Sequence, residues 1–595
     1  MRFIHQLISC LDFRTAGIAA CVPAGAAEAV PHESVLTGQP GHILAPLGFL
    51  LHSNRQDATA DDAAAGVPKT SRYRDDRFDR PPAPATGTFA FTQRDLRVLL
   101  IVILAIAAFL RFYALPSMPP GLFCDEGMDG SDALAAIETH HFDVFYPEDN
   151  GREGLYVNLA AVCVDVLGNK AWVLRLPAAL FGLFTVLGVY LLVTELISVP
   201  TGLLAAFFIA TSFWHINFSR IAFRAIAAPF FLAWALYLML VAFRRLRERR
   251  PYIGWMALAG FVYSLGFYTY IAYRATPVVI GLVLLHRFNL ARKENWLDGF
   301  WKAAAVLTIA TVLVAAPLAV YFVQHTGAFT GRAAQVSVFE APHPVQEIGI
   351  NFWKTVMMLY TRGDSNWRHN YGDRPEVYWP VAAFMTLGFL IAIGRLISGG
   401  KDEGQLPYLV ALSWLFVGAM PAFLSDEGVP HALRAILMVP AVFLLAAIGA
   451  RSLYAGLARI VHNGILPAAA TVVLLALTYE AGYTYFVRWA ENPIVPAFFD
   501  IGGADLAKEI NAYPRNLPKV VAVTAQGISF HRLPMPVASV MYLTKTYTDR
   551  EQAAAHIRYY TPDTFERPIP PELQGRDFCE VVTAMTPGVK VFCMR

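Results

Sequence analysis

Acidic, basic and histidine side chains gather in five short segments that lie between long apolar runs of the sequence. The segments are Cys124-Asp125-Glu126, Ser219-Arg220 with Arg224, Tyr273-Arg274, Gly363 to Asn370, and His431 with Arg434. They occupy alternate connections between the apolar runs, so chain reversals would bring all of them to one face of a membrane. Carboxylates there could act as a general base or hold a metal ion. Arginines there could bind phosphate oxygens.

The first of these segments supplies the acidic pair Asp125-Glu126, which follows a Pro-Pro-Gly turn. Either carboxylate could take a proton from an acceptor hydroxyl or bind a divalent metal ion. A hydrated loop acid would give the same pattern. Arg152 and Glu153 form a second charged pair in the same connection and extend the candidate site.

Arginines are the stronger chemical signal. The candidates are Arg220, Arg224, Arg274, Arg368 and Arg434. Positive charge is disfavoured on the outer face, and ionisable groups at membrane depth are usually paired or functional. Their converging donors predict a phosphate or pyrophosphate site, where His369 or His431 could donate to a leaving oxygen or bind a metal. Snorkelling to headgroups or pairing with nearby carboxylates is the alternative for each arginine, and no spacing resembles a zinc site.

The apolar runs must position these residues. The chain is 56% hydrophobic and 16% charged, whereas soluble proteins have about a quarter of their residues charged. We therefore expect an all-α polytopic membrane protein with about eleven transmembrane helices of roughly 20 residues each. The expected spans are Val98–Phe109, Trp172–Leu196, Val199–Phe218, Ala225–Phe243, Tyr252–Ile271, Thr276–Leu285, Ala303–Phe322, Val377–Ile397, Leu406–Leu424, Ala435–Ala450 and Ile465–Phe486.

Basic clusters occupy the other set of connections. They are Arg244–Arg250, His286–Lys293, Arg395–Lys401 and Arg451–Arg459. Short loops rich in Lys and Arg stay in the cytoplasm, so we expect the five motif-bearing segments to face outside. The N-terminus would then be inside and the tail after Trp489 outside. A net charge of +3 gives no argument for nucleic-acid binding.

Three regions follow from this pattern. We expect a disordered cytoplasmic extension at 1–95, a transmembrane domain at 96–490 with large outer loops 116–170 and 324–376, and a small exported α/β domain at 491–595. Asp129 or Ser131 could cap a short helix at 133–139. In the tail we expect strands at Val520–Val523, Val537–Leu543, Glu580–Ala584 and Val589–Cys593, and a helix at Glu551–Arg558. A hairpin centred on Thr586 would set Cys579 opposite Cys593.

Residues 97–487 resemble the GT-C superfamily of glycosyltransferases that depend on polyprenyl-phosphate sugars. The likeness is closest to bacterial relatives of protein O-mannosyltransferases and aminoarabinose transferases. It is carried by Asp125-Glu126, Phe218-Ser219-Arg220-Ile221 with Arg224 and Pro229, Gly363-Asp364-Ser365-Asn366-Trp367-Arg368-His369-Asn370, and Pro430-His431-Ala432-Leu433-Arg434. It does not extend to 1–95 or clearly to 500–595. Gly127 is a departure, because many relatives have a larger residue there.

The resemblance implies an inverting hexosyl or pentosyl transfer from a polyprenyl-phosphate sugar to an acceptor hydroxyl on the outer face of a bacterial cytoplasmic membrane. Asp125 and Glu126 would be catalytic. Asp125 would deprotonate the acceptor, and Glu126 would position it, help hold the fold or bind a metal. The arginines and His369 would bind the donor phosphate, and Arg152 and Glu153 would belong to an acceptor or donor loop. The sugar, the acceptor (protein, lipid or glycan) and any divalent metal stay open.

Two other functions fit the same composition. A glycan ligase with a lipid-pyrophosphate donor would need a larger outer cavity. A lipid or solute transporter should place polar residues or broken helices near the middle of its spans. Here the polar residues lie at span ends on one side, which disfavours transport.

Overall fold

A computed structural model describes residues 92–148, 151–335, 337–399, 403–461, 464–523, 529–530, 533–560, 578–583 and 591–594. The predicted extension at 1–95 lies outside these residues up to position 91. The transmembrane helices and the C-terminal region belong to one compact unit.

Among the described residues, eight helices are long and apolar enough to cross a membrane. They are Ala171–Leu196, Arg224–Arg247, Ile271–Lys293, Leu297–Gln324, Trp379–Ile397, Leu406–Phe423, Ile436–Leu457 and Ile465–Trp489. Three further helices coincide with the remaining expected spans but are shorter or more charged: α4 (Gln93–Phe112), α8 (Val199–Ala210) and α11 (Ile253–Leu265). The chain is thus a multi-pass integral membrane protein whose membrane part is all-α, while the number eleven and the orientation stay predictions.

The most buried helices form the centre of the bundle. α7 (Ala171–Leu196) packs on α8 and α10 (Ala227–Arg247), and α16 (Trp379–Ile397) packs on α18 (Val439–Leu457). Gly388 and Gly449 permit the last contact, because a Cβ at Gly388 would lie 1.9 Å from the carbonyl oxygen of Leu445. Small residues commonly allow such close packing in membranes.

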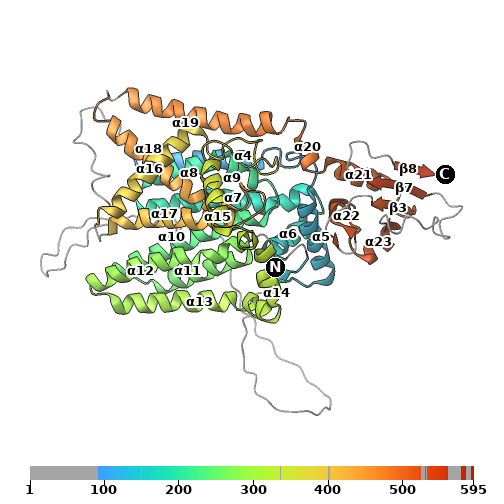
Figure 1. The fold of residues 1–595 in the computed structure, drawn as a ribbon, viewed down its shortest axis with the longest axis horizontal. Helices are drawn as coiled ribbons and strands as arrows, with labels where there is room; N and C mark the ends of the chain where they lie inside the picture. Colours follow the sequence, from blue (N-terminus) through green and yellow to red (C-terminus); the bar gives the residue numbers. More distant parts are fainter. Residues whose placement is uncertain are drawn as a thin grey trace, which may run out of the picture. The chain divides into compact units, whose positions relative to one another are not determined.

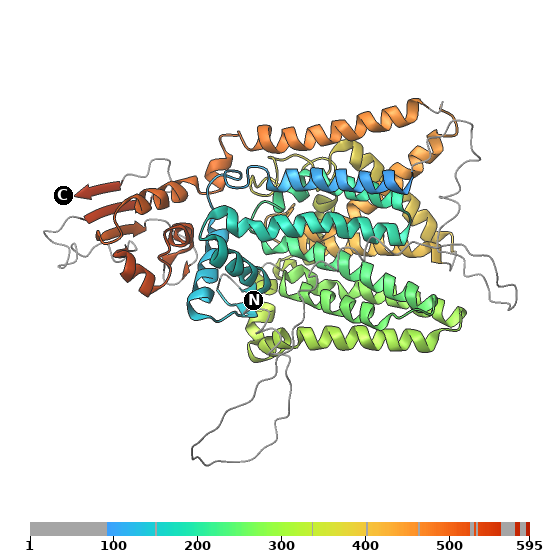
Figure 2. The same cartoon turned by 180° about the vertical axis from the view of Figure 1, so that it is seen from behind.

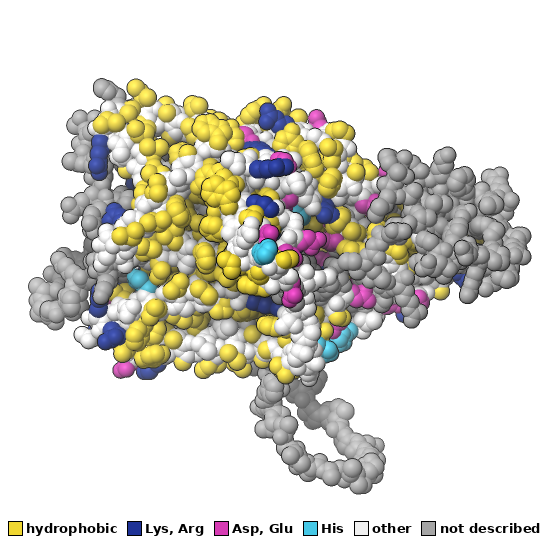
Figure 3. Space-filling model, viewed as in Figure 1, with side chains coloured by type: hydrophobic (Ala, Val, Ile, Leu, Met, Phe, Trp, Pro, Cys, Tyr) yellow, Lys and Arg dark blue, Asp and Glu magenta, His cyan; other side chains and the backbone are white. Residues whose placement is uncertain are grey.

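Less buried helices lie at the sides of this centre. α11 and α13 (Leu297–Gln324) pack together along one side, with α12 (Pro277–Lys293) against α13 and α17 (Leu406–Phe423); α19 (Ile465–Tyr483) runs along the other side (Figures 1 and 2). Side chains of α13 and α19 are mostly exposed and apolar. Figure 3 shows this broad apolar surface, as expected for helices that face lipid.

Short helices and strands cover one end of the bundle. They are α5 (Cys124–Thr139), β1 (Phe145–Tyr146), β2 (Arg152–Glu153), α6 (Leu155–Leu167), α14 (Thr326–Gln335) and α15 (Pro344–Met358). The expected cap at Asp129 or Ser131 was wrong, because α5 already begins at Cys124. Its first turn is stabilised when Glu126 accepts a hydrogen bond from the Phe123 N–H at 3.2 Å.

The C-terminal region combines short helices with a four-stranded sheet. Its elements are α20 (Val495–Phe498), α21 (Ile501–Ala512), β3 (Lys519–Val523), α22 (Ala538–Thr544), α23 (Asp549–Ala555), β6 (Ile557–Tyr560), β7 (Phe578–Thr583) and β8 (Val591–Met594). The sheet order is β6-β3-β7-β8, with β3 parallel to β6 and β7, and β8 antiparallel to β7. The register pairs Cys579 with Cys593, as the sequence predicts.

Two of the expected elements in this region were wrong. The expected strand at Val537–Leu543 is mostly the helix α22, because its side chains pack on α5 and against the core of the C-terminal region. Such tertiary packing overrides the strand preference of Val and Tyr. The expected helix at Glu551–Arg558 ends at Ala555, and the chain then enters β6.

Candidate functional site

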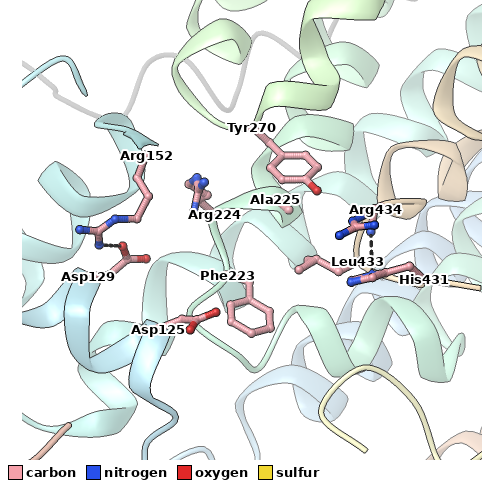
Figure 4. A pocket seen from close by; sticks show the side chains of 10 residues that line it. All are labelled: Asp125, Asp129, Arg152, Phe223, Arg224, Ala225, Tyr270, His431, Leu433 and Arg434. Atoms are coloured by element: carbon pink, nitrogen blue, oxygen red, sulfur yellow. Dashed lines mark hydrogen bonds and ion pairs between the residues drawn. The ribbon is translucent and has the colours of Figure 1, made fainter. Parts of the chain in front are cut away.

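Four of the five motif-bearing connections, all but the one with Gly363 to Asn370, contribute residues to one pocket at the end of the bundle covered by α5 and α6 (Figure 4). Its lining residues are Asp125, Asp129, Arg152, Phe223, Arg224, Ala225, Tyr270, His431, Leu433 and Arg434. They come from α5, β2, the turn before α10, the segment before α12 and the connection between α17 and α18. The proximity that alternate connections predict is therefore observed for these residues.

The two neighbouring acids have different surroundings. Asp125 is partly exposed and lines the pocket. The Glu126 side chain is fully buried, and Arg175 donates to both of its oxygens, at 2.8 and 2.9 Å. The Ala222 N–H donates to Glu126 as well, at 2.8 Å. These contacts tie the start of α5 to α7 and to the segment before α10, which favours a structural role for Glu126 and a chemical one for Asp125.

Arg175 is a residue near the candidate site that the sequence analysis did not single out. It lies in the first turn of α7, is fully buried, and also donates to the carbonyl oxygens of Pro119 and Gly121 at 2.6 and 2.9 Å. An arginine inside an apolar span was the signal available in the sequence, because charged residues there are usually paired or functional.

The charged pair Arg152 and Glu153 takes part in two separate networks. Arg152 is buried, lines the pocket, and donates to Asp129 at 2.6 Å and to Asp132. Burial raises the pKa of Asp132 to about 6, and Arg152 opposes this shift.

Glu153 accepts from two of the predicted arginines, Arg224 at 3.3 Å and Arg274 at 3.2 Å. Arg224 remains at the pocket wall. Arg274 does not line the pocket and lies over the rings of Phe322 and Phe329.

The remaining predicted arginines also differ in whether they line the pocket. Arg434 lines the pocket and donates to Ser425 and to the Glu427 carbonyl oxygen. The Arg368 guanidinium lies 3.5 Å from the centre of the Phe123 ring. Burial lowers the pKa of Arg368, and the nearby Asp125 carboxylate counteracts this shift.

Arg220 is fully buried away from the pocket lining. It donates to the carbonyl oxygens of Leu110, Tyr113 and Met118 at 3.2, 2.8 and 2.9 Å. These contacts secure the end of α4 and the turn before α5, so they favour a structural role for Arg220 over donor binding.

Asp364, His369 and His431 form a cluster beside the pocket, and their ligand atoms lie within 4.8 Å of one another. Asp364 is held by the N–H groups of Asn366 and Ala432, both at 2.8 Å. The His369 Nδ1 lies 2.8 Å from the same carboxylate. Burial opposes ionisation of Asp364, but the hydrogen bond from His369, the interactions with both imidazoles and the Asn366 N–H lower its pKa.

This donor set fits a divalent cation. Two imidazoles and a carboxylate are ligands typical of zinc and related ions. Burial lowers the pKa of both His369 and His431, which favours the neutral imidazoles that bind metal. Hydrogen bonding among the three side chains is the alternative explanation of their proximity.

We expect the purified protein to retain about one divalent ion per chain, as a single three-ligand site requires. His431→Ala should lower this content, whereas His343→Ala, at an exposed position, should not. Inductively coupled plasma mass spectrometry after gel filtration measures the ratio. If the metal content of the wild-type protein does not exceed the background, the cluster binds no metal ion and its proximity is explained by hydrogen bonding alone.

Comparison with known families agrees with the resemblance over part of the chain. Residues 155–321 match the family described as dolichyl-phosphate-mannose-protein mannosyltransferase. The match runs from α6 to α13 and covers less than half of the chain. No curated protein sequence matches.

Solved structures resemble this chain at low sequence identity. ArnT from Cupriavidus metallidurans bound to undecaprenyl phosphate is 13% identical, with 81% of this chain and 93% of that chain covered and a TM-score of 0.49. The oligosaccharyltransferase AglB from Archaeoglobus fulgidus, in complex with an inhibitory peptide and a dolichol-phosphate, is 14% identical. That comparison covers 78% of this chain and 69% of that chain, with a TM-score of 0.46. The arabinofuranosyltransferase AftD from Mycobacteria is 14% identical, with 73% of this chain and 30% of that chain covered and a TM-score of 0.39.

Proposed function

We propose that the protein transfers a sugar from a polyprenyl phosphate to an acceptor hydroxyl, with inversion, at the outer face of a bacterial cytoplasmic membrane. The observation that carries this proposal is the contrast within the acidic pair: Asp125 lines the pocket, whereas Glu126 is bonded to Arg175. The family match to donors carried on dolichyl phosphate supports the choice of donor.

Asp125 acts as the general base. Its carboxylate accepts the proton of the acceptor hydroxyl while the hydroxyl oxygen forms a bond to the anomeric carbon of the sugar. The bond from that carbon to the phosphate oxygen breaks, and its electron pair leaves with the lipid phosphate. Attack on the face opposite the phosphate inverts the anomeric centre in one step.

Arg224 and Arg434 neutralise the charge that develops on the departing phosphate. Both lie at the pocket wall with Asp125, and Arg368 lies close to the same carboxylate. Preorganised donors aimed at a developing charge are worth a few kcal/mol each in a site that excludes water. A cation held by Asp364, His369 and His431 would supply further positive charge beside the phosphate.

Arg434→Ala is expected to lower the turnover rate about 10²-fold and to weaken binding of the donor lipid. The guanidinium would be lost from the pocket wall, while the backbone position of Asp125 should stay. Arg459→Ala, an exposed change in a basic connection predicted to be cytoplasmic, is the matched control. Wild-type turnover and donor affinity in Arg434→Ala would contradict this role.

The function itself is tested by sugar transfer in detergent. Purified protein would be given radiolabelled polyprenyl-phosphate sugars and crude envelope acceptors, and transferred label would be counted. Transfer from one donor with inverted product would support the proposal. Binding of no lipid-phosphate donor, together with no transfer, would contradict it and favour the transporter interpretation.

A further inference from the structure

The first turn of α5, which carries Asp125, lies in backbone contact with α22 of the C-terminal region. A Cβ atom built on Gly127 would lie 2.5 Å from the Ser539 nitrogen and 2.6 Å from its Cα atom. These are backbone atoms, so no rotamer change could relieve the overlap. Gly127 therefore marks a close approach between two segments distant in the sequence.

Neighbouring residues of α5 strengthen this contact. Met128 is 1% exposed and belongs to the hydrophobic core of the C-terminal region, together with Val537, Val540 and Met541. A Cβ on Gly130 would lie 2.6 Å from the Tyr542 ring. α5 is thus built into the C-terminal region along one side.

Polar contacts hold the same two parts together. The Asn169 amide donates to the carbonyl oxygens of Tyr542 and Leu543 at 3.1 and 3.2 Å. The Thr548 hydroxyl donates to Glu138 at 3.0 Å, at the far end of α5. The Thr548 bond fixes the C-terminal end of α5, whereas the Asn169 bonds fix the end of α22 to the connection between α6 and α7.

Helical geometry gives these contacts a consequence for Asp125. Successive residues of an α-helix point about 100° apart. Glu126 points to Arg175 in the bundle, Gly127 and Met128 face the C-terminal region, and Asp125 faces the pocket. The bundle and the C-terminal region together leave the first turn of α5 only one orientation.

We propose that the C-terminal region, through α22, is a positioning element that sets the place of the Asp125 carboxylate. The inference rests on the proposed function, because it assigns α22 a role in transfer. Gly127 and Ser539 are positioning residues. They do not touch the substrate, but they determine where the base lies relative to the acceptor hydroxyl.

The test compares Gly127→Ala with Gly349→Ala in the full-length protein. Alanine favours helix at both positions, but the Cβ at Gly349, in α15, meets open space. Gly127→Ala should lower kcat about 10²-fold, as expected for a base misplaced by about 1 Å, with the KM for the donor unchanged. Hydrogen exchange of the α5 amides should become faster in this variant alone.

Asn169→Ala provides a milder second variant, in case Gly127→Ala does not fold. It removes the two hydrogen bonds to the end of α22 without touching α5. Folded Asn169→Ala should show faster exchange in α5 and a lower kcat at unchanged KM. Wild-type exchange and kcat in folded variants would overturn the proposal.

The two proposals fail in different ways. If the wild-type protein transfers no sugar, the proposed function fails, while the exchange of α5 amides still reports whether α22 holds α5. If transfer occurs but kcat and KM worsen together in both variants, α22 supports the general fold and the positioning role is rejected.

Discussion

The Asp125→Asn substitution is expected to lower the rate of sugar transfer about 10²- to 10⁴-fold, the range typical of a lost general base. Asn keeps the size and hydrogen-bonding capacity of the side chain but cannot accept the acceptor proton. Because the pocket arginines remain, binding of the lipid donor should not weaken. Initial rates with radiolabelled donor, measured at saturating acceptor, give the result.

Asp165→Asn is the matched control for this experiment. Asp165 is an exposed acid on α6, in the same connection between α4 and α7, and does not line the pocket. It should transfer sugar at the wild-type rate. Equal rates in wild type and Asp125→Asn would move the base elsewhere and contradict the division of roles within the acidic pair.

The Glu126→Gln substitution is expected to destabilise the protein by about 3–5 kcal/mol, as when one partner of a buried ion pair is removed. Arg175 would keep its charge in a fully buried position, while the carboxylate it now contacts at 2.8 and 2.9 Å would be replaced by a neutral amide with a single acceptor oxygen. The midpoint of thermal unfolding in detergent should fall clearly.

Glu294→Gln offers a matched comparison. Glu294 pairs with Arg247 at 2.9 Å, but at a solvent-exposed position. Exposed pairs contribute at most about 1 kcal/mol, so the midpoint should hardly move. An equal shift in the two variants would mean that burial does not distinguish the two pairs, and would reject the structural role of Glu126.

The apolar runs were enough to predict the helical membrane fold, because hydrocarbon length fixes span length. They also predicted that the Asp125, Arg224 and Arg434 segments would meet, and these line one pocket. The sequence could not assign different roles to Asp125 and Glu126. Their difference depends on Arg175, which lies 49 residues from Glu126 in the sequence. The sequence could not distinguish the roles of Arg220 and Arg224 either, because the carbonyl oxygens that Arg220 contacts lie more than 100 residues away in the sequence.

The C-terminal region was harder to predict. Val537–Leu543 contains the Val and Tyr residues typical of a strand, yet it forms a helix because its partner is α5. Gly127 looked like an isolated departure until Ser539 was seen beside it. In both places the deciding contact joins segments far apart in the sequence.

This separation also sets an order of assembly during synthesis. Thr548 reaches its partner Glu138 across 410 residues, and Tyr547 reaches Asp132 across 415. At typical elongation rates of 5–20 residues per second, α5 would wait about 20–80 s for the segment that completes its packing. In a nascent chain the membrane helices would therefore form before α22 reaches α5, and the first turn of α5 would lack its contact with Ser539 until the C-terminal region is made.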